Sequence, residues 1–119
     1  HKVDLIRAEH LCTCQTIMLT DKDNPDHINY HYYYFFVPRN LTVADSKSAH
    51  MTTDTILAKL QMLTEKLNIL DKDKIMHMLD HLSQMNKKVM CRTYLSTKYL
   101  DAMNKYVTML DYALENLTL

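Results

Sequence analysis

From about Thr52 to the C-terminus, apolar residues recur at steps of three and four, and this spacing constrains the fold more than any other feature. In an α-helix, such steps place side chains on one face. Three stripes follow one another: Ile56, Leu60, Leu63, Leu67 and Leu70; Ile75, Leu79, Leu82 and Met85 or Met78; and Leu100, Met103, Val107, Leu110, Leu114 and Leu117. They predict helices over 53–70, 71–86 and about 93–117.

Local signals agree with a C-terminal helical bundle of three helices over 53–119. Thr52 or Thr53 can cap the first helix, and Asp54 suits the positive end of its dipole. We expect the second helix to break at Asn86. A two-stranded coiled coil is the weaker interpretation, because the last stripe is wide and is flanked by few charges. Those flanking residues are Tyr99, Tyr106 and Ala113 on one side and Asn104 and Asp111 on the other.

Residues 1–43 carry a different pattern, which predicts an N-terminal β-hairpin. The segment 11–19 is rich in Thr and Ile, and a polar turn with Pro25 follows it. Ile28, Tyr30, Tyr32, Tyr34 and Phe36 then alternate at period two, and Pro38 ends the run. We expect the tyrosines at 30, 32 and 34 to face one way and to be largely buried. A helix over 3–19 is the alternative for the first arm.

The fold class predicted is therefore α+β, with residues 44–52 as a small, polar linker between hairpin and bundle. Ser48–Ala49–His50–Met51 also resembles a join before a start methionine. This leaves open whether residues 1–50 and 51–119 are one natural chain.

Composition limits the classes of function. The 119 residues carry a formal net charge of zero, which argues against general binding of nucleic acid. No run reaches the roughly 18 apolar residues of a membrane span. Three cysteines make a poor disulfide framework, and reduced thiols favour an intracellular protein of cytoplasm or nucleus.

Glycine and tryptophan are both absent, and Lys outnumbers Arg eleven to three. This bias is typical of an AT-rich genome, such as that of a large DNA virus. Without glycine, every turn should use Asn, Asp or Pro, and no tight phosphate-binding loop can form.

One set of residues could bind a metal. Cys12 and Cys14 precede His27 and His31 by a spacing that resembles the Cys2His2 zinc finger. The spacing departs from that family, because a single residue separates the cysteines and the histidines lie on an expected strand. We therefore favour no cofactor, and we keep a zinc-stabilised domain that contacts nucleic acid as the alternative.

No catalytic constellation is present, so an enzyme is not expected. The serines lie in no strained turn, and Cys91 has only cationic neighbours such as Lys88 and Arg92. The aromatic tract 30–36 could stack bases, but it lacks interleaved Lys or Arg.

The sequence best fits a small, non-enzymatic module for protein–protein interaction or oligomerisation. Its last helix is expected to be longer than the two before it, so part of its stripe should stay uncovered. We expect a homodimer, or a complex with a helical partner, and no membrane association. The residues predicted to bind the partner are Tyr99, Met103, Tyr106, Leu110 and Leu114.

Overall fold

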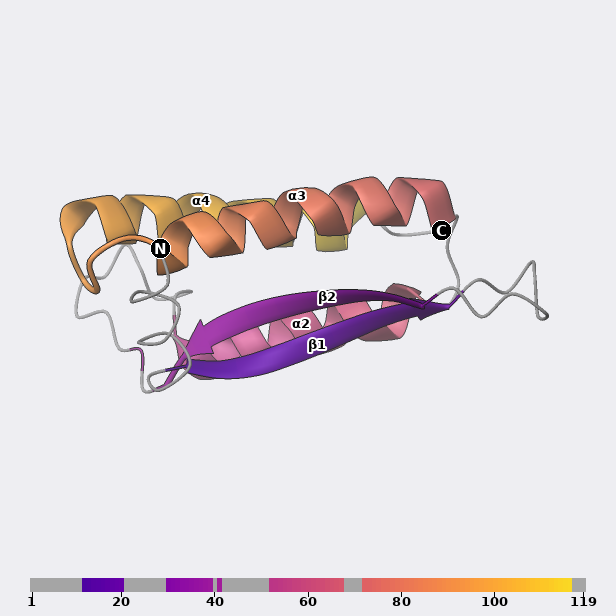
Figure 1. Ribbon diagram of the computed structural model, residues 1–119, viewed down its shortest axis with the longest axis horizontal. Coiled ribbons are helices and arrows are strands. Elements are labelled where there is room, and N and C mark those ends of the chain that lie inside the picture. Colours follow the sequence, from indigo (N-terminus) through magenta and orange to yellow (C-terminus); the bar gives the residue numbers. More distant parts are fainter. Residues whose placement is uncertain (1–11, 21–29, 40, 42–51, 68–71, 117–119) are drawn as a thin grey trace.

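A two-stranded antiparallel hairpin is followed by three helices, which confirms the α+β class (Figure 1). The computed structural model describes residues 12–20, 30–39, 41, 52–67 and 72–116. The elements are β1 (Cys12–Thr20), β2 (Tyr30–Pro38), α2 (Thr53–Lys66), α3 (Lys72–Met90) and α4 (Thr97–Asn116). The predicted turn around Pro25 and most of the 44–52 linker lie outside the described residues.

The strands pair along their whole length, from Cys12 opposite Pro38 to Thr20 opposite Tyr30. The expectation of a strand in the first arm is thus confirmed for residues 12–20, and the alternative helix is wrong there. Successive side chains of a strand point to opposite faces. One face of the hairpin is therefore formed by odd-numbered residues and the other by even-numbered residues.

The face of the hairpin that is buried is the opposite of the one expected, because the buried positions of β2 are shifted by one residue. The buried aromatic side chains of β2 are Tyr33 and Phe35, whereas Tyr32 and Tyr34 are each 51% exposed. The side chain of Tyr30 is outside the described part. Residues 32–36 are all aromatic, so both faces of the strand are apolar. The pattern therefore could not indicate which face is buried.

Helix α2 begins where the sequence predicts and ties the hairpin to the bundle. The hydroxyl of Thr52 accepts a hydrogen bond from the Thr55 amide at 3.2 Å, which satisfies one of the free donors of the first turn. The Thr53 hydroxyl donates to the Pro38 carbonyl oxygen and accepts from the Leu41 amide at 2.7 Å. The end of β2 and the start of α2 are thereby held together.

Helices α3 and α4 are of nearly equal length, 19 and 20 residues, and lie side by side (Figure 1). The expected break at Asn86 is wrong, because α3 continues through the buried Val89 to Met90. Helix α4 starts at Thr97, later than expected, where the Ser96 hydroxyl accepts from the Tyr99 amide at 3.1 Å.

The turn between these helices uses a leucine where a glycine is common. Leu95 has a φ of 61°, the left-handed region that glycine adopts most easily. Its side chain is 47% exposed, so burial compensates little of that strain. The expectation that Asn, Asp or Pro would form every turn is therefore wrong here.

A single apolar core joins the hairpin to the helices. Figure 1 shows α2 behind the hairpin and α3 along the side of β2. Ile17, Phe35 and Val37 from the strands pack in the same cluster as residues from all three helices. An ion pair between Lys59 and Asp111, at 2.7 Å, adds a link between α2 and α4. Segments on either side of the 44–52 linker thus fold onto one another.

Candidate functional site

The stripe of α4 that was expected to bind a partner lies inside the chain's own core. Its five residues are all buried, and their exposed fractions are Tyr99 2%, Met103 1%, Tyr106 1%, Leu110 0% and Leu114 9%. The expectation that some of them stay uncovered is wrong, so this stripe offers no surface to a partner.

The error has a physical cause in the length of α3. The expectation assumed that two short helices would leave part of α4 bare. Because α3 runs on to Met90, it matches α4 almost residue for residue, and α2 and the hairpin close the remaining sides. An amphipathic stripe that is wide because it meets several neighbours cannot be distinguished, in sequence, from one that meets a partner chain.

The hairpin carries the largest apolar side chains left open on the described strands. Met18, Tyr32 and Tyr34 are each about half exposed, at 48%, 51% and 51%. They belong to the even-numbered face, which is turned away from the core, and the register places Met18 opposite Tyr32 and Thr16 opposite Tyr34. Aromatic and methionine side chains are enriched where proteins meet other proteins.

One buried side chain of α3 bonds to the outer edge of β2. The Asn86 side-chain oxygen accepts from the Phe36 amide at 2.9 Å, and its NH2 group donates to the Phe36 carbonyl oxygen at 2.9 Å. Asn86 is only 1% exposed. Its amide satisfies both backbone groups of a residue that a further strand would otherwise pair with.

The same contact shows which amide and carbonyl groups of β1 point away from β2. Since both polar groups of Phe36 bond to Asn86, Phe36 and the opposite Cys14 form a pair without mutual hydrogen bonds. Such pairs alternate with bonded ones along an antiparallel ladder. The amides and carbonyls of Cys14, Thr16 and Met18 therefore point away from β2. Within the described part of the chain, no hydrogen bond to these groups is found.

The residues of the predicted zinc set are not brought together. Cys14 lies on the exposed face near one end of the hairpin, and Cys12 is buried beside it, 3.7 Å from the sulfur of Met90. His31 belongs to the opposite face and pairs with Leu19 at the other end. Seven residues of strand, about 23 Å, separate the position opposite Cys12 from His31. His27 lies outside the described residues.

The surroundings of the Cys12 thiol disfavour its thiolate form. Burial raises the pKa of the Cys12 thiol, and nearby Arg39 opposes this rise only in part. A raised pKa lowers the fraction of thiolate, which is both the nucleophile and the metal ligand. Among the described residues, no group of three or more His, Cys, Asp or Glu side chains is placed to hold a metal ion.

Tyr99 and Tyr106 bring buried hydroxyls into the core, and neither makes a hydrogen bond of good geometry within the described structure, although the Asn86 side chain is near enough to Tyr106 to oppose part of the rise in its pKa. Burial raises the pKa of both hydroxyls well above the ordinary tyrosine value. Tyr33 differs, because its hydroxyl faces the Asp80 carboxylate. Burial raises the pKa of Tyr33 and that carboxylate adds to the rise. None of these groups is poised to exchange a proton near neutral pH.

Sequence reasoning missed Asn86, although a signal was present. Leu79, Leu82, Asn86 and Val89 continue the apolar stripe of α3 at steps of three and four, so Asn86 occupies a core position. A polar residue at such a position usually has a specific partner. The partner is on a strand 50 residues earlier, and the sequence alone does not reveal it.

Comparisons with models of protein families, with curated proteins and with solved structures find no match to this chain. Across the described part of the chain, none of the helices has the length and apolar character needed to cross a bilayer. The candidate site therefore rests on the hairpin alone, and it consists of the β1 edge together with Met18, Tyr32 and Tyr34.

Proposed function

We propose that this protein is a non-enzymatic oligomerisation module that forms a homodimer by pairing β1 with the β1 strand of a second copy. The observation that supports it most directly is the contrast between the two hairpin edges. Helix α3 packs along β2 and its Asn86 bonds both backbone groups of Phe36, whereas the other edge presents the backbone groups of Cys14, Thr16 and Met18 to no described partner.

The composition of β1 suits a second copy as the occupant. Its nine residues, CTCQTIMLT, contain neither charge nor proline. Those are the two devices that most often keep exposed strand edges from pairing. An identical strand can therefore approach without repulsion between like charges. Thr16 is the central residue of β1, so an antiparallel pair centred on it overlaps both strands fully.

A twofold pair of this kind would also extend the apolar surface of the hairpin. Met18 and Tyr34 of each copy would lie on one continuous face of a four-stranded sheet, because neighbouring strands keep the same pleat. Twofold pairs are the commonest closed assemblies. A complex with a helical partner through α4, which the sequence had suggested, loses its support because that stripe is buried.

Light scattering coupled to gel filtration tests the proposal. At high micromolar concentration, the wild type should have twice the 14.1 kDa mass of one chain. The variant Thr16→Lys should be a monomer, since two ammonium groups would then face each other across the twofold axis. Thr16 is exposed, so its replacement should leave the fold intact, which thermal melting followed by circular dichroism can verify.

The matched control is Thr108→Lys, which makes the same change at an exposed position of α4. It should leave the dimer unchanged. A monomeric wild type at high micromolar concentration would overturn the proposal. So would a Thr108→Lys variant that dissociates as fully as Thr16→Lys, because the effect would then come from net charge.

An intracellular location, in cytoplasm or nucleus, goes with this proposal. Cys12, Cys14 and Cys91 carry free thiols. Reducing compartments keep thiols in that form.

A further inference from the structure

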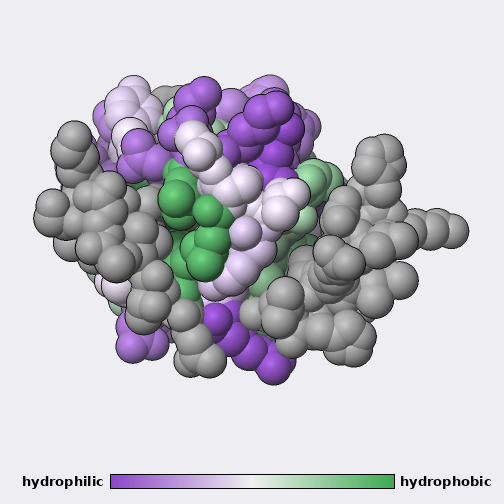
Figure 2. Space-filling model, turned by 90° about the vertical axis from the view of Figure 1, so that its left-hand side faces the viewer, coloured by the Kyte–Doolittle hydropathy of each residue, from purple (hydrophilic) through white to green (hydrophobic). Residues whose placement is uncertain are grey.

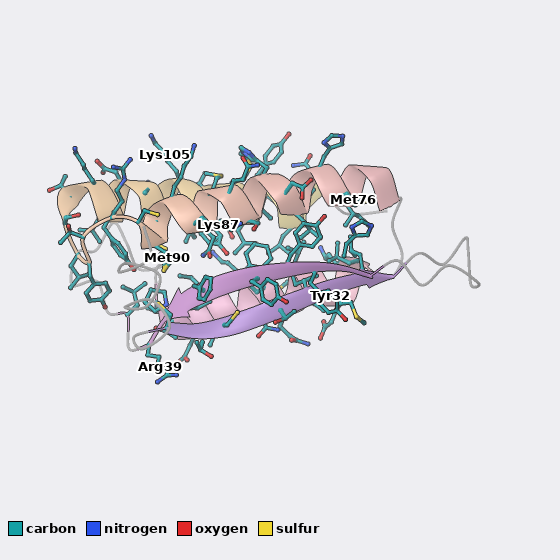
Figure 3. The ribbon with its side chains drawn as sticks, viewed as in Figure 1. Tyr32, Arg39, Met76, Lys87, Met90 and Lys105 are labelled. Atoms are coloured by element: carbon teal, nitrogen blue, oxygen red, sulfur yellow. The ribbon has the colours of Figure 1, made fainter. Side chains whose placement is uncertain are left out.

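A second surface, on the helices, has a different chemistry. A hollow of about 520 Å³ lies between α3 and α4. The residues that line it are His81, Met85 and Lys88 from α3, Arg92 just after that helix, and Lys98, Asp101, Ala102 and Lys105 from α4. In Figure 3, Lys105 points away from the hairpin, so this hollow is separate from the β1 edge.

The charge of this hollow is strongly one-sided. Four permanent cations line it, Lys88, Arg92, Lys98 and Lys105, against the single carboxylate of Asp101. Each of the four is exposed, and within the described residues none has an ion pair within 4 Å. The whole chain has a formal net charge of zero, so the hollow is a local concentration of positive charge.

The geometry lets cations from both helices reach one ligand. Residues 81 to 88 of α3 span about 10 Å, at 1.5 Å per residue, and Arg92 follows the end of the helix. Arg92 offers a planar set of donors, and the lysines offer compact ammonium groups. Both are the usual donors for phosphate oxygens. Met85 and Ala102 provide an apolar floor. Cavities of about 300–1,000 Å³ are typical of small-molecule sites.

We propose that the hollow between α3 and α4 binds a compact ligand that carries two or more phosphate groups. A nucleic-acid polymer fits less well for two reasons. The chain has no overall positive charge to attract a polyanion from a distance. No Phe, Tyr or Trp side chain, the usual platforms for base stacking, lines the hollow. The phosphates could belong to a free molecule or to a lipid headgroup, and the experiment separates these sources.

Isothermal titration calorimetry with tripolyphosphate, at low salt, tests the site directly. Wild-type protein should bind one tripolyphosphate per chain. Lys88→Glu and Lys105→Glu should each weaken binding about tenfold or more, because each reverses a charge that faces the ligand from one of the two helices. A second arm uses phosphatidylcholine vesicles with and without a bisphosphorylated inositol lipid. Co-sedimentation with the phosphorylated vesicles would assign the phosphates to a headgroup, and binding of tripolyphosphate alone would assign them to a free ligand.

The matched control is Lys87→Glu, one residue before Lys88 on the same helix but outside the lining. Figure 3 shows Lys87 on the opposite side of the helix pair from Lys105. This variant should change the affinity less than about threefold, since its charge lies farther from the ligand. Equal losses for Lys87→Glu and Lys88→Glu would overturn the proposal, as would an absence of binding at high micromolar protein. Tighter binding of an eight-residue oligothymidine than of tripolyphosphate would also overturn it.

Discussion

The two strands of the hairpin have the same length, nine residues each, but they differ in what packs against them. Helix α3 packs along β2 and bonds to its outer backbone through Asn86, and β2 contributes Tyr33, Phe35 and Val37 to the core. Strand β1 buries Ile17 and Leu19 on the same face, but no described residue pairs with its outer edge. The comparison teaches that an apolar composition does not by itself decide which edge remains available. The packing of a neighbouring helix decides it.

The largest expected effect is the difference in the free energy of unfolding between a variant on the buried face of the hairpin and one on its exposed face. Phe35→Ala should lower the free energy of unfolding by about 3–5 kcal/mol, because a fully buried ring leaves a cavity. Tyr34→Ala, at the adjacent position, should change it by only about 0.5 kcal/mol. Urea denaturation of both variants measures the difference. Equal losses would mean that the open face is covered in solution, by a partner or by another part of the chain.

A smaller effect is expected at the outer edge of β2. Asn86→Ala should lower the free energy of unfolding by about 2–4 kcal/mol, since the Phe36 amide and carbonyl would both remain buried without a partner. Gln84→Ala, at an exposed position of the same helix, is the control and should stay within about 0.5 kcal/mol of wild type. If Asn86→Ala is equally mild, water replaces the side chain, and the two edges of the hairpin are less different than the contacts indicate.

The smallest effect concerns the buried hydroxyls behind the hairpin. Tyr106→Phe should leave stability unchanged or raise it by about 1 kcal/mol at pH 7, because it removes a buried hydroxyl that makes no hydrogen bond of good geometry within the described structure. Tyr112→Phe, at a residue 60% exposed, is the control. A clear loss of stability in Tyr106→Phe would show that its hydroxyl is satisfied, for example by a buried water.

The same variant has a signature at high pH. Because burial raises the pKa of Tyr106 in the folded state, its contribution to stability is complete below the unfolded pKa of about 10. It is lost as the pH rises above that value, by about 1.4 kcal/mol per pH unit for each such group. Between pH 10 and 11, the stability of Tyr106→Phe should therefore fall less steeply than that of wild type.

Much of the fold was readable from the sequence. The steps of three and four predict all three helices, and Thr52, one of the two threonines expected as a cap, is the N-cap of α2. The boundary of α3 was wrong because Asn86 followed by two lysines has the composition of a helix end. In the structure, the side-chain amide of Asn86 bonds to β2, and the helix continues to Met90. Composition indicates the local preference for a helix end, whereas the role of Asn86 depends on its contact with Phe36, 50 residues earlier in the chain.

The candidate surfaces were harder to predict, for two physical reasons. Residues 32–36 are aromatic at every position, so period two carries no information about which face is buried. The hollow combines cations that are separated in the sequence, Lys88 and Arg92 before the turn and Lys98 and Lys105 after it. They become neighbours only once α3 and α4 pack side by side. At the end of the molecule that Figure 2 shows, a small apolar area lies beside residues of intermediate hydropathy, with hydrophilic residues above and below.

The side chain of Asn86 has a consequence for how far an assembly can grow. If two copies pair through β1, the resulting sheet has the order β2–β1–β1–β2, and both of its outer strands are β2. Each of these outer strands is then covered by α3 of its own subunit, whose Asn86 amide occupies the backbone groups of Phe36. Growth would stop at two chains, since open-ended filaments require an unpaired edge at each end. The asparagine would thus act as a terminator of polymerisation, built into every subunit.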